Sequence, residues 1–394
     1  MVAGWPAGSN GWERGDPPAM STVPWKVLVV FGTRPEAIKL APLIRELECD
    51  PGRFATRVCV TAQHRGLLDQ VLAVFQITPH TDLAVMQEDQ EPAQVVARCL
   101  SRLGPVLEAE RPDWVIVQGD TTTTVAASLA AYYLGIRVGH VEAGLRTGDK
   151  RRPFPEEMNR RLTSCLADLH FAPTPEARNN LLQAGIPDAH IHVTGNTGID
   201  ALHFIRESLA HRIARIPCLE RLNGSRPLLL VTGHRRESFG EGLRQICEAL
   251  REIARTCDVD IVYSVHLNPR VHGPVKSLLG NLPNVHLIDP VDYATFLALM
   301  QRSHLILTDS GGIQEEAPSL GKPVLVLRDV TERREGLEAG TARLVGTDTR
   351  TIVEQTVRLL RDPEAYHRMQ NTTNPYGDGK ASARIARILA AQPR

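Results

Sequence analysis

The chain has 394 residues, which is long enough for two compact domains. Lysine and arginine together number 45, as do aspartate and glutamate, so the formal net charge is zero. This balance argues against a protein that coats nucleic acid or binds membranes through a polybasic segment. Apolar residues make up 42% of the chain and charged residues 23%, which is typical of a globular protein. No apolar run approaches the ~18 residues that a membrane span needs.

The cysteines and histidines form no recognisable metal site or disulfide framework. The seven cysteines are odd in number and include no C-x-x-C pair, and the 14 histidines include no H-E-x-x-H arrangement. Free thiols of this kind fit a reducing compartment. We therefore expect a cytoplasmic protein that binds no metal.

Residues 1–25 differ in composition from the rest of the chain. They are rich in glycine, proline, serine and charged residues, and they lack the apolar segment of a secretory signal. We expect them to be a disordered N-terminal extension.

From Lys26 onward, short apolar runs alternate with longer amphipathic stretches. The predicted strands are Lys26–Phe31, Arg57–Thr61, Trp114–Gln118, Arg137–Val141, Leu169–Ala172, Leu228–Thr232, Asp260–Val265, Leu305–Thr308 and Pro323–Leu327. Most are apolar throughout, as in parallel sheets whose two faces are both covered. The predicted helices include Pro35–Glu48, Pro92–Glu110, Thr124–Leu134, Glu241–Arg255 and Thr349–Arg361. This alternation predicts doubly wound α/β sheets.

The strand and helix pattern runs along the chain twice. We expect a first Rossmann-like domain at 26–197, a second at 198–371, and a terminal helical segment, 372–394, that packs back on the first domain. Parallel sheets bind ligands at the carboxyl ends of their strands, so two facing sheets would place a site in the cleft between them.

The first motif, FGTRPEAIK, follows the first predicted strand. Gly32 allows the turn, and Pro35 suits the first turn of a helix. The free N–H groups of this turn, with Arg34 and Lys39, suit an anion. A plain turn with two solvated cations is an equally good interpretation.

The second motif, QGDTTTT, places Asp120 and four threonines between a strand and a helix. One such residue would be enough to cap the helix, and threonine disfavours helix interiors. We therefore favour a functional role for this run over a cluster of caps.

The third motif joins HVEAGLRT to RPFPEEMNRR. Glu142 ends an apolar strand, while Glu156 and Glu157 open a helix, where the helix dipole favours anions. Salt bridges to nearby arginines explain some of these charges but explain a glutamate at a strand end less well.

Two further motifs follow strands of the second series. In TGHRRES, His234 lies beside two arginines after a glycine, which suits an anion or an acid–base group. In TDSGGIQEE, the sequence Ser310-Gly311-Gly312 brings N–H groups together at a helix start, and Glu316 is placed to accept hydrogen bonds from ribose hydroxyls.

Together and in this order, these motifs closely resemble the non-hydrolysing UDP-N-acetylglucosamine 2-epimerases. The resemblance extends from Lys26 to the last helix and includes TDSGGIQEEAPSLGKPVL. It implies a GT-B-like fold of two Rossmann-type domains facing a central cleft, and usually a homodimer. It also implies interconversion of UDP-GlcNAc and UDP-ManNAc for cell-surface polysaccharide synthesis, through elimination of UDP to a 2-acetamidoglucal and re-addition. No cofactor is implied, and the NAD fingerprint is missing.

The resemblance also implies roles for individual residues. It implies catalytic roles for Asp120, Glu142, Glu156 and His234; we expect proton transfer by Asp120 and Glu156, with Glu142 tuning them or itself acting as the base. It implies substrate contacts by Arg34, Lys39, Phe296, Ser310, Gly311, Gly312, Glu316 and Arg333. Gln63 and His64 resemble part of an allosteric site for a second UDP-GlcNAc.

This chain departs from the family pattern at three positions. Val291 stands where some members have Gln, Arg334 where Pro is usual, and Gly66 where Glu is common. Other functions stay open: a hydrolysing epimerase that releases UDP and ManNAc, an epimerase of a modified UDP-sugar, a GT-B glycosyltransferase, and a UDP-sugar-binding regulator without activity.

Overall fold

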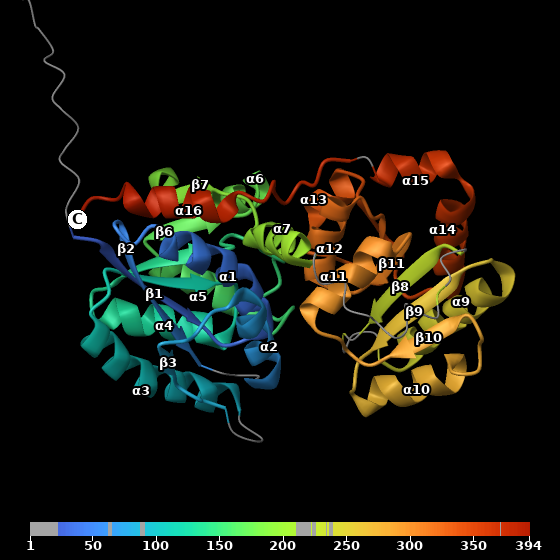
Figure 1. Cartoon of the computed structure of the whole chain (residues 1–394), viewed down its shortest axis with the longest axis horizontal. Helices are drawn as coiled ribbons and strands as arrows, with labels where there is room; N and C mark the ends of the chain where they lie inside the picture. The colour runs from blue at the N-terminus through green and yellow to red at the C-terminus, as the bar shows by residue number, and fades with distance from the viewer. Residues whose placement is uncertain are drawn as a thin grey trace, which may run out of the picture.

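The computed structural model describes residues 23–61, 65–86, 91–209, 222, 226–233, 235, 239–370 and 372–394. Two α/β lobes lie side by side along its long axis (Figure 1). The first lobe contains the strands β1 (Trp25–Phe31), β2 (Phe54–Val60), β3 (Thr81–Asp82), β4 (Trp114–Gln118), β5 (Arg137–Val141), β6 (Leu169–Ala172) and β7 (Ile191–Val193). Its helices are α1 (Arg34–Glu48), α2 (Arg65–Phe75), α3 (Pro92–Glu110), α4 (Thr122–Tyr133), α5 (Glu156–Leu166) and α6 (Pro175–Gln183).

The second lobe is built in the same way. Its strands are β8 (Leu228–Gly233), β9 (Asp260–Val265), β10 (Val285–Ile288), β11 (Leu305–Thr308), β12 (Val324–Val326) and β13 (Ala342–Leu344). Its helices are α9 (Glu241–Thr256), α10 (Pro269–Leu279), α11 (Tyr293–Arg302), α12 (Gly311–Glu316), α13 (Arg334–Glu338), α14 (Thr349–Arg361) and α15 (Pro363–Gln370). In the described part of the chain, no helix is both long and apolar enough to cross a membrane.

Both sheets are parallel throughout and share one strand order. The seven-stranded sheet runs β3-β2-β1-β4-β5-β6-β7, and the six-stranded sheet runs β10-β9-β8-β11-β12-β13. Counted within each lobe, both orders begin 3-2-1-4-5-6, the order of a Rossmann fold. The predicted doubly wound parallel sheets are therefore confirmed.

Central strands match their predicted bounds better than the strands at sheet edges do. Each of β4, β5, β6, β9 and β11 has the predicted bounds. The short edge strands β3, β7, β10 and β13 were not predicted, because their partly exposed residues lack the continuous apolar run of a central strand.

The first strand begins within the predicted N-terminal extension. Trp25 belongs to β1: its N–H donates to the carbonyl of Arg53 over 2.7 Å, and its side chain is only 6% exposed. The guanidinium of Arg137 lies 4.8 Å from its ring centroid. The extension therefore cannot include Trp25, whereas residues 1–22 lie outside the described part of the chain.

The helix α7 (Thr197–Leu209) connects the two lobes. It starts at the predicted domain boundary and packs against α1 of the first lobe and against α11 and α12 of the second. Its Phe204 stacks on Phe75 of α2, with ring centroids 5.1 Å apart. Apolar side chains of both lobes consequently form one continuous core.

The last helix, α16 (Ala381–Ala390), returns to the first lobe, where it packs on α1 and α7 (Figure 1). The carboxylate of Asp200 in α7 accepts hydrogen bonds from the N–H groups of Ala381 (3.2 Å) and Ser382 (2.8 Å). A side chain from another helix thus satisfies the first N–H groups of α16.

This cap gives a prediction for stability. Asp200→Ala should lower the free energy of unfolding by about 1–2 kcal/mol, because two buried N–H groups lose their acceptor. The change is measured by thermal or urea unfolding. The matched control is Asp378→Ala, whose carboxylate pairs at the surface with Arg384 and should contribute about 0–1 kcal/mol. Equal losses in the two variants would contradict this account.

Candidate active site

A cleft of about 560 Å³ lies between the lobes. The loops that follow β1 and β4 line one wall, and the loops that follow β8 and β11 line the other. In each sheet these two strands are neighbours at the point where the strand order reverses. Open parallel sheets bind ligands at this point, so the cleft is the candidate site.

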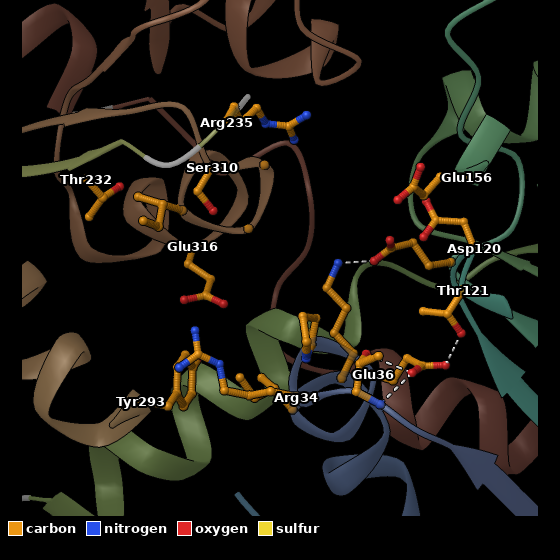
Figure 2. A pocket seen from close by; sticks show the side chains of 18 of the residues that line it. Arg34, Glu36, Asp120, Thr121, Glu156, Thr232, Arg235, Tyr293, Ser310 and Glu316 are labelled. Atoms are coloured by element: carbon orange, nitrogen blue, oxygen red, sulfur yellow. Dashed lines mark hydrogen bonds and ion pairs between the residues drawn. The ribbon is translucent and has the colours of Figure 1, made fainter. Parts of the chain in front are cut away.

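Every predicted catalytic or substrate-binding residue that the structure describes lines this cleft. They are Arg34, Lys39, Asp120, Glu142, Glu156, Phe296, Ser310, Gly311, Gly312, Glu316 and Arg333. Figure 2 shows Asp120 and Glu156 on the wall of the first lobe, across the cleft from Ser310 and Arg235. Three further predicted residues lie outside the described residues, namely Gln63, His64 and His234.

Glu36 holds the turn after β1. Its buried carboxylate accepts hydrogen bonds from the N–H groups of Gly32 (3.1 Å) and Thr33 (2.8 Å) and from the hydroxyl of Thr33 (2.7 Å). The prediction that these N–H groups are free for an anionic ligand is therefore wrong, because a side chain of the protein occupies them. Burial raises the pKa of Glu36, and its hydrogen bonds oppose that rise.

The threonines after β4 mainly form hydrogen bonds that connect and hold the loops of the first lobe. The hydroxyl of Thr121 donates to Glu36 over 2.6 Å, which joins the loops after β1 and β4 (Figure 2). The hydroxyl of Thr124 donates to the carbonyl of Gln118 over 2.7 Å. Of the motif QGDTTTT, Gln118, Asp120 and Thr121 line the cleft, whereas the last three threonines do not, so the functional interpretation of the whole run is too broad.

Helix α5 fixes the position of Asp120. The guanidinium of Arg160 lies 2.6 Å from Oδ2 of Asp120, and the side-chain amide of Asn159 donates to the carbonyl of the same residue over 2.8 Å. Arg160 is only 5% exposed. This charge-assisted contact orients the Asp120 carboxylate while leaving part of it open to the cleft.

The two glutamates that open α5 have different surroundings. Glu157 is fully buried and accepts hydrogen bonds from the N–H of Thr147 (3.1 Å) and from Arg160 (3.3 Å) and Arg161 (3.2 Å). Glu156 instead faces the cleft, and its buried Oε2 atom has no hydrogen-bond partner among the described residues. Glu157 therefore has a structural position, whereas Glu156 keeps an acceptor available to a ligand.

Glu142 directly follows β5 and has a strained backbone conformation. Its φ of +62° is uncommon for a residue with a side chain and marks a position held by its surroundings. Its side chain is 9% exposed and forms an ion pair with Lys39 of α1. Burial raises the pKa of Glu142, and Lys39 opposes that rise.

The Lys39–Glu142 pair belongs to a longer series of alternating charges. Lys39 also lies 3.0 Å from Glu315 of α12, which contacts Arg333 over 2.8 Å, and Arg333 pairs in turn with Glu332. We call these five residues the interlobe ion chain. Because Glu142 and Lys39 belong to the first lobe and the others to the second, the chain connects the walls of the cleft.

Gly311 allows Arg333 to reach its place beside α12. A Cβ atom at this glycine would lie 2.8 Å from Cζ of Arg333, which is closer than real Cβ contacts come. Both residues line the cleft, so the glycine keeps the guanidinium against the start of α12.

Glu316 lies one residue beyond the interlobe ion chain and has a different environment. Its carboxylate points toward Arg34 and lies near Tyr293 (Figure 2). Burial, followed by the neighbouring charge of Glu315, raises its pKa to about 8. Near neutral pH, this side chain is therefore mainly a neutral acid that can both donate and accept a hydrogen bond.

The two departures from the family pattern in the second lobe are compatible with the observed local structure. Val291 lines the cleft near Phe296 and adds an apolar surface. Arg334 is the exposed first residue of α13, a position that proline also favours. Arginine at this position therefore leaves the helix start intact.

Several residues of the site received no role from the sequence, although the quoted motifs include some of them. Arg160 lies four residues after Glu156, a spacing that puts both on one helix face and could have indicated it. The contacts of Glu315 and Glu332 join residues distant in the sequence and leave no local signal. Glu36, Asn196 and Arg235 are further examples of residues without an assigned role.

The raised pKa of Glu316 gives a prediction for stability. Since its carboxyl has an ordinary pKa of 4.5 and a pKa of about 8 in the fold, the folded protein binds the extra proton between these values. Its contribution therefore lowers stability as the pH rises through this window. Glu316→Gln removes the ionisable group, so the variant should gain stability over the parent protein, by on the order of 2 kcal/mol more at pH 9 than at pH 6.

Thermal unfolding at both pH values measures this gain, and Glu338→Gln on the exposed face of α13 is the control. The same gain at pH 6 and pH 9 would contradict the assignment.

The sequence and the fold have close relatives. The profile of the UDP-N-acetylglucosamine 2-epimerase family matches residues 45–390. A UDP-N-acetylglucosamine 2-epimerase of Salmonella typhimurium is 57% identical over 369 residues, covering 92% of this chain and 98% of that protein.

Solved structures give the same result. The UDP-GlcNAc 2-epimerase from Neisseria meningitidis bound to UDP-GlcNAc superposes with a TM-score of 0.89 at 50% identity, covering 93% of this chain and 100% of that one. The Methanocaldococcus jannaschii UDP-GlcNAc 2-epimerase in complex with UDP-GlcNAc and UDP has a TM-score of 0.80 at 36% identity, with coverage of 93% and 100%. With the two facing parallel sheets, these likenesses confirm the predicted GT-B-like fold. The chain belongs to the UDP-N-acetylglucosamine 2-epimerase family.

Proposed function

We propose that this protein interconverts UDP-GlcNAc and UDP-ManNAc by a non-hydrolysing route, as a step toward cell-surface polysaccharide. The observation that carries the proposal is the arrangement of the cleft. Asp120, Glu142 and Glu156 line one wall, while Ser310 and Arg333 line the other, at the start of α12. Carboxylates thus face a site that suits a diphosphate.

The reaction needs both walls. The C2 hydrogen of the sugar is not adjacent to a carbonyl, so simple removal and return of the proton is not feasible. In the proposed route a base removes the C2 proton, and the electron pair of the C2–H bond forms the double bond between C1 and C2. The bond from C1 to the UDP oxygen breaks, and its electron pair leaves with UDP. The 2-acetamidoglucal then accepts UDP again at C1 and a proton on the opposite face of C2. Each step conserves atoms and charge.

We assign proton transfer to Asp120 and Glu156. The guanidinium of Arg160 orients the Asp120 carboxylate at the edge of the cleft, and Glu156 has an oxygen without an internal partner. Glu142, which is paired with Lys39, tunes these groups or acts as the base itself. A role for His234 as an acid–base group follows from the family resemblance alone.

We assign UDP binding to the second lobe, with Arg34 of the first lobe contributing from the opposite wall. Ser310, Gly311 and Gly312 start α12 and hold the diphosphate with Arg333, whose positive charge stabilises the departing UDP. Glu316 binds ribose hydroxyls, and Phe296 lies on the uracil side.

Two further proposals follow from the family resemblance: the protein forms a homodimer, and a second UDP-GlcNAc binds at Gln63 and His64. Light scattering measures the first. For the second, a saturation curve without cooperativity in UDP-GlcNAc would contradict an allosteric site.

The proposed function is tested by proton NMR of UDP-GlcNAc incubated with the protein in D₂O. UDP-ManNAc with deuterium at C2 and little free sugar is expected. Free ManNAc with an equal amount of UDP would replace the proposal with a hydrolysing epimerase. An unchanged spectrum would contradict the proposal and direct the search to modified UDP-sugars.

The role of Asp120 is tested by Asp120→Asn. This variant should bind UDP normally but lose at least ~10²-fold in kcat, because an amide cannot accept the proton. The control Asp149→Asn makes the same chemical change at an exposed position of the same lobe and should leave kcat within about twofold. Near-normal turnover by Asp120→Asn would exclude proton transfer by this residue.

A further inference from the structure

Glu315 contacts both lobes but does not line the cleft. Its Oε2 atom accepts hydrogen bonds from Nζ of Lys39 (3.0 Å) and from the side-chain amide of Asn196 (2.7 Å). Its Oε1 atom accepts from Nε (2.9 Å) and Nη2 (2.8 Å) of Arg333. The side chain is only 3% exposed. Since protein donors occupy both oxygens, Glu315 is placed to hold other residues rather than to contact a ligand.

The two cations that Glu315 holds both line the cleft, and each has a second carboxylate partner. Lys39 is shared between Glu315 and Glu142, and Arg333 is shared between Glu315 and Glu332. Glu315 is therefore the central member of the interlobe ion chain and joins its two halves.

Burial makes this sharing consequential. Charges in a low-dielectric interior interact far more strongly than in water. An ion that loses one of two partners therefore interacts more strongly with the partner that remains. Without the charge of Glu315, Lys39 would pair with Glu142 alone. Arg333 would likewise keep only Glu332 and would bind an incoming anion more strongly.

Glu316, the next residue in α12, lies outside the ion chain, although the charge of Glu315 also raises its pKa. It lines the cleft and faces Arg34, whereas Glu315 points away from the cleft into the ion chain. Adjacent carboxylates of one short helix thus serve different parts of the site.

We propose that Glu315 is a positioning residue. It shares Lys39 with Glu142 and restrains Arg333, and it thereby sets both the acidity of Glu142 and the affinity for the diphosphate. This inference rests on the proposed function. Removing the carboxylate charge at position 315 should weaken catalysis and tighten UDP binding, a combination that simple damage to the fold does not produce.

The direction of the pH effect follows from the groups that face Glu142. The charges with the largest effect on the Glu142 carboxyl are those of Lys39 from α1, Glu315 from α12 and Arg333 from the segment before α13. Glu315 is the only negative charge among these three, and it raises the pKa of Glu142. Its loss should lower that pKa. The limb of the rate profile that reports Glu142 should therefore move to lower pH, whether Glu142 acts as base or as acid.

The test compares Glu315→Gln with the parent protein and with the exposed control Glu338→Gln. Three quantities are measured: kcat per UDP-binding site, the Kd of UDP by calorimetry, and the pH profile of kcat. We expect kcat to fall at least about tenfold, Kd to tighten about fivefold, and the limb to shift to lower pH. Values within twofold of the parent protein, or a weaker UDP affinity, would overturn the inference.

Glu315→Asp serves as the second variant and carries the test if Glu315→Gln does not fold. It keeps the charge but is one methylene shorter, so it cannot reach Lys39 and Arg333 together. It should lower kcat per UDP-binding site without tightening UDP binding, and an unchanged kcat would overturn the inference. If the parent protein itself does not convert UDP-GlcNAc, the proposed function fails instead, which separates the two failures.

Discussion

The interlobe ion chain is the constraint on which the site depends. Its five residues alternate in sign from Glu142 through Lys39, Glu315 and Arg333 to Glu332, and they come from both lobes. Buried charges are costly unless they are paired, so each member requires its neighbours. The two walls of the cleft are thereby held at a distance set by side-chain contacts, in addition to the apolar core around α7.

The symmetry of the two sheets explains why such a chain can form. Each lobe has the same strand order, so each presents one switch point, and these points face each other across the cleft. The chemistry of the two walls differs because the loops differ. Carboxylates follow the strands of the first lobe, whereas a Ser-Gly-Gly helix start follows β11 in the second. A similar architecture thus places carboxylates on one wall and a Ser-Gly-Gly helix start on the other, and the proposed function uses them as acid–base groups and as an anion-binding surface.

The sequence allowed the fold and the members of the cleft to be predicted, because both depend on local patterns. Apolar runs marked the central strands, and polar residues at their ends marked the cleft, including Asp120 and Glu142. It did not allow the internal partners to be predicted. Glu36 occupies N–H groups that appeared free, and Glu315 holds residues from distant segments. Such pairings depend on tertiary distances, which spacing along one sequence does not report.

The surroundings of Glu142 and Glu316 show that residues of the site lower the stability of the folded chain. Glu142 adopts a left-handed backbone conformation at a strand end, and burial raises the pKa of both carboxyl groups. Each feature destabilises the folded chain, and each lies in the cleft rather than elsewhere in the core. The Glu316 carboxyl, with a pKa of about 8, can share a proton near neutral pH, which an ordinary exposed glutamate does poorly. In the proposed function, the stability lost at these two positions prepares the cleft for proton transfer and for hydrogen bonding to a sugar nucleotide.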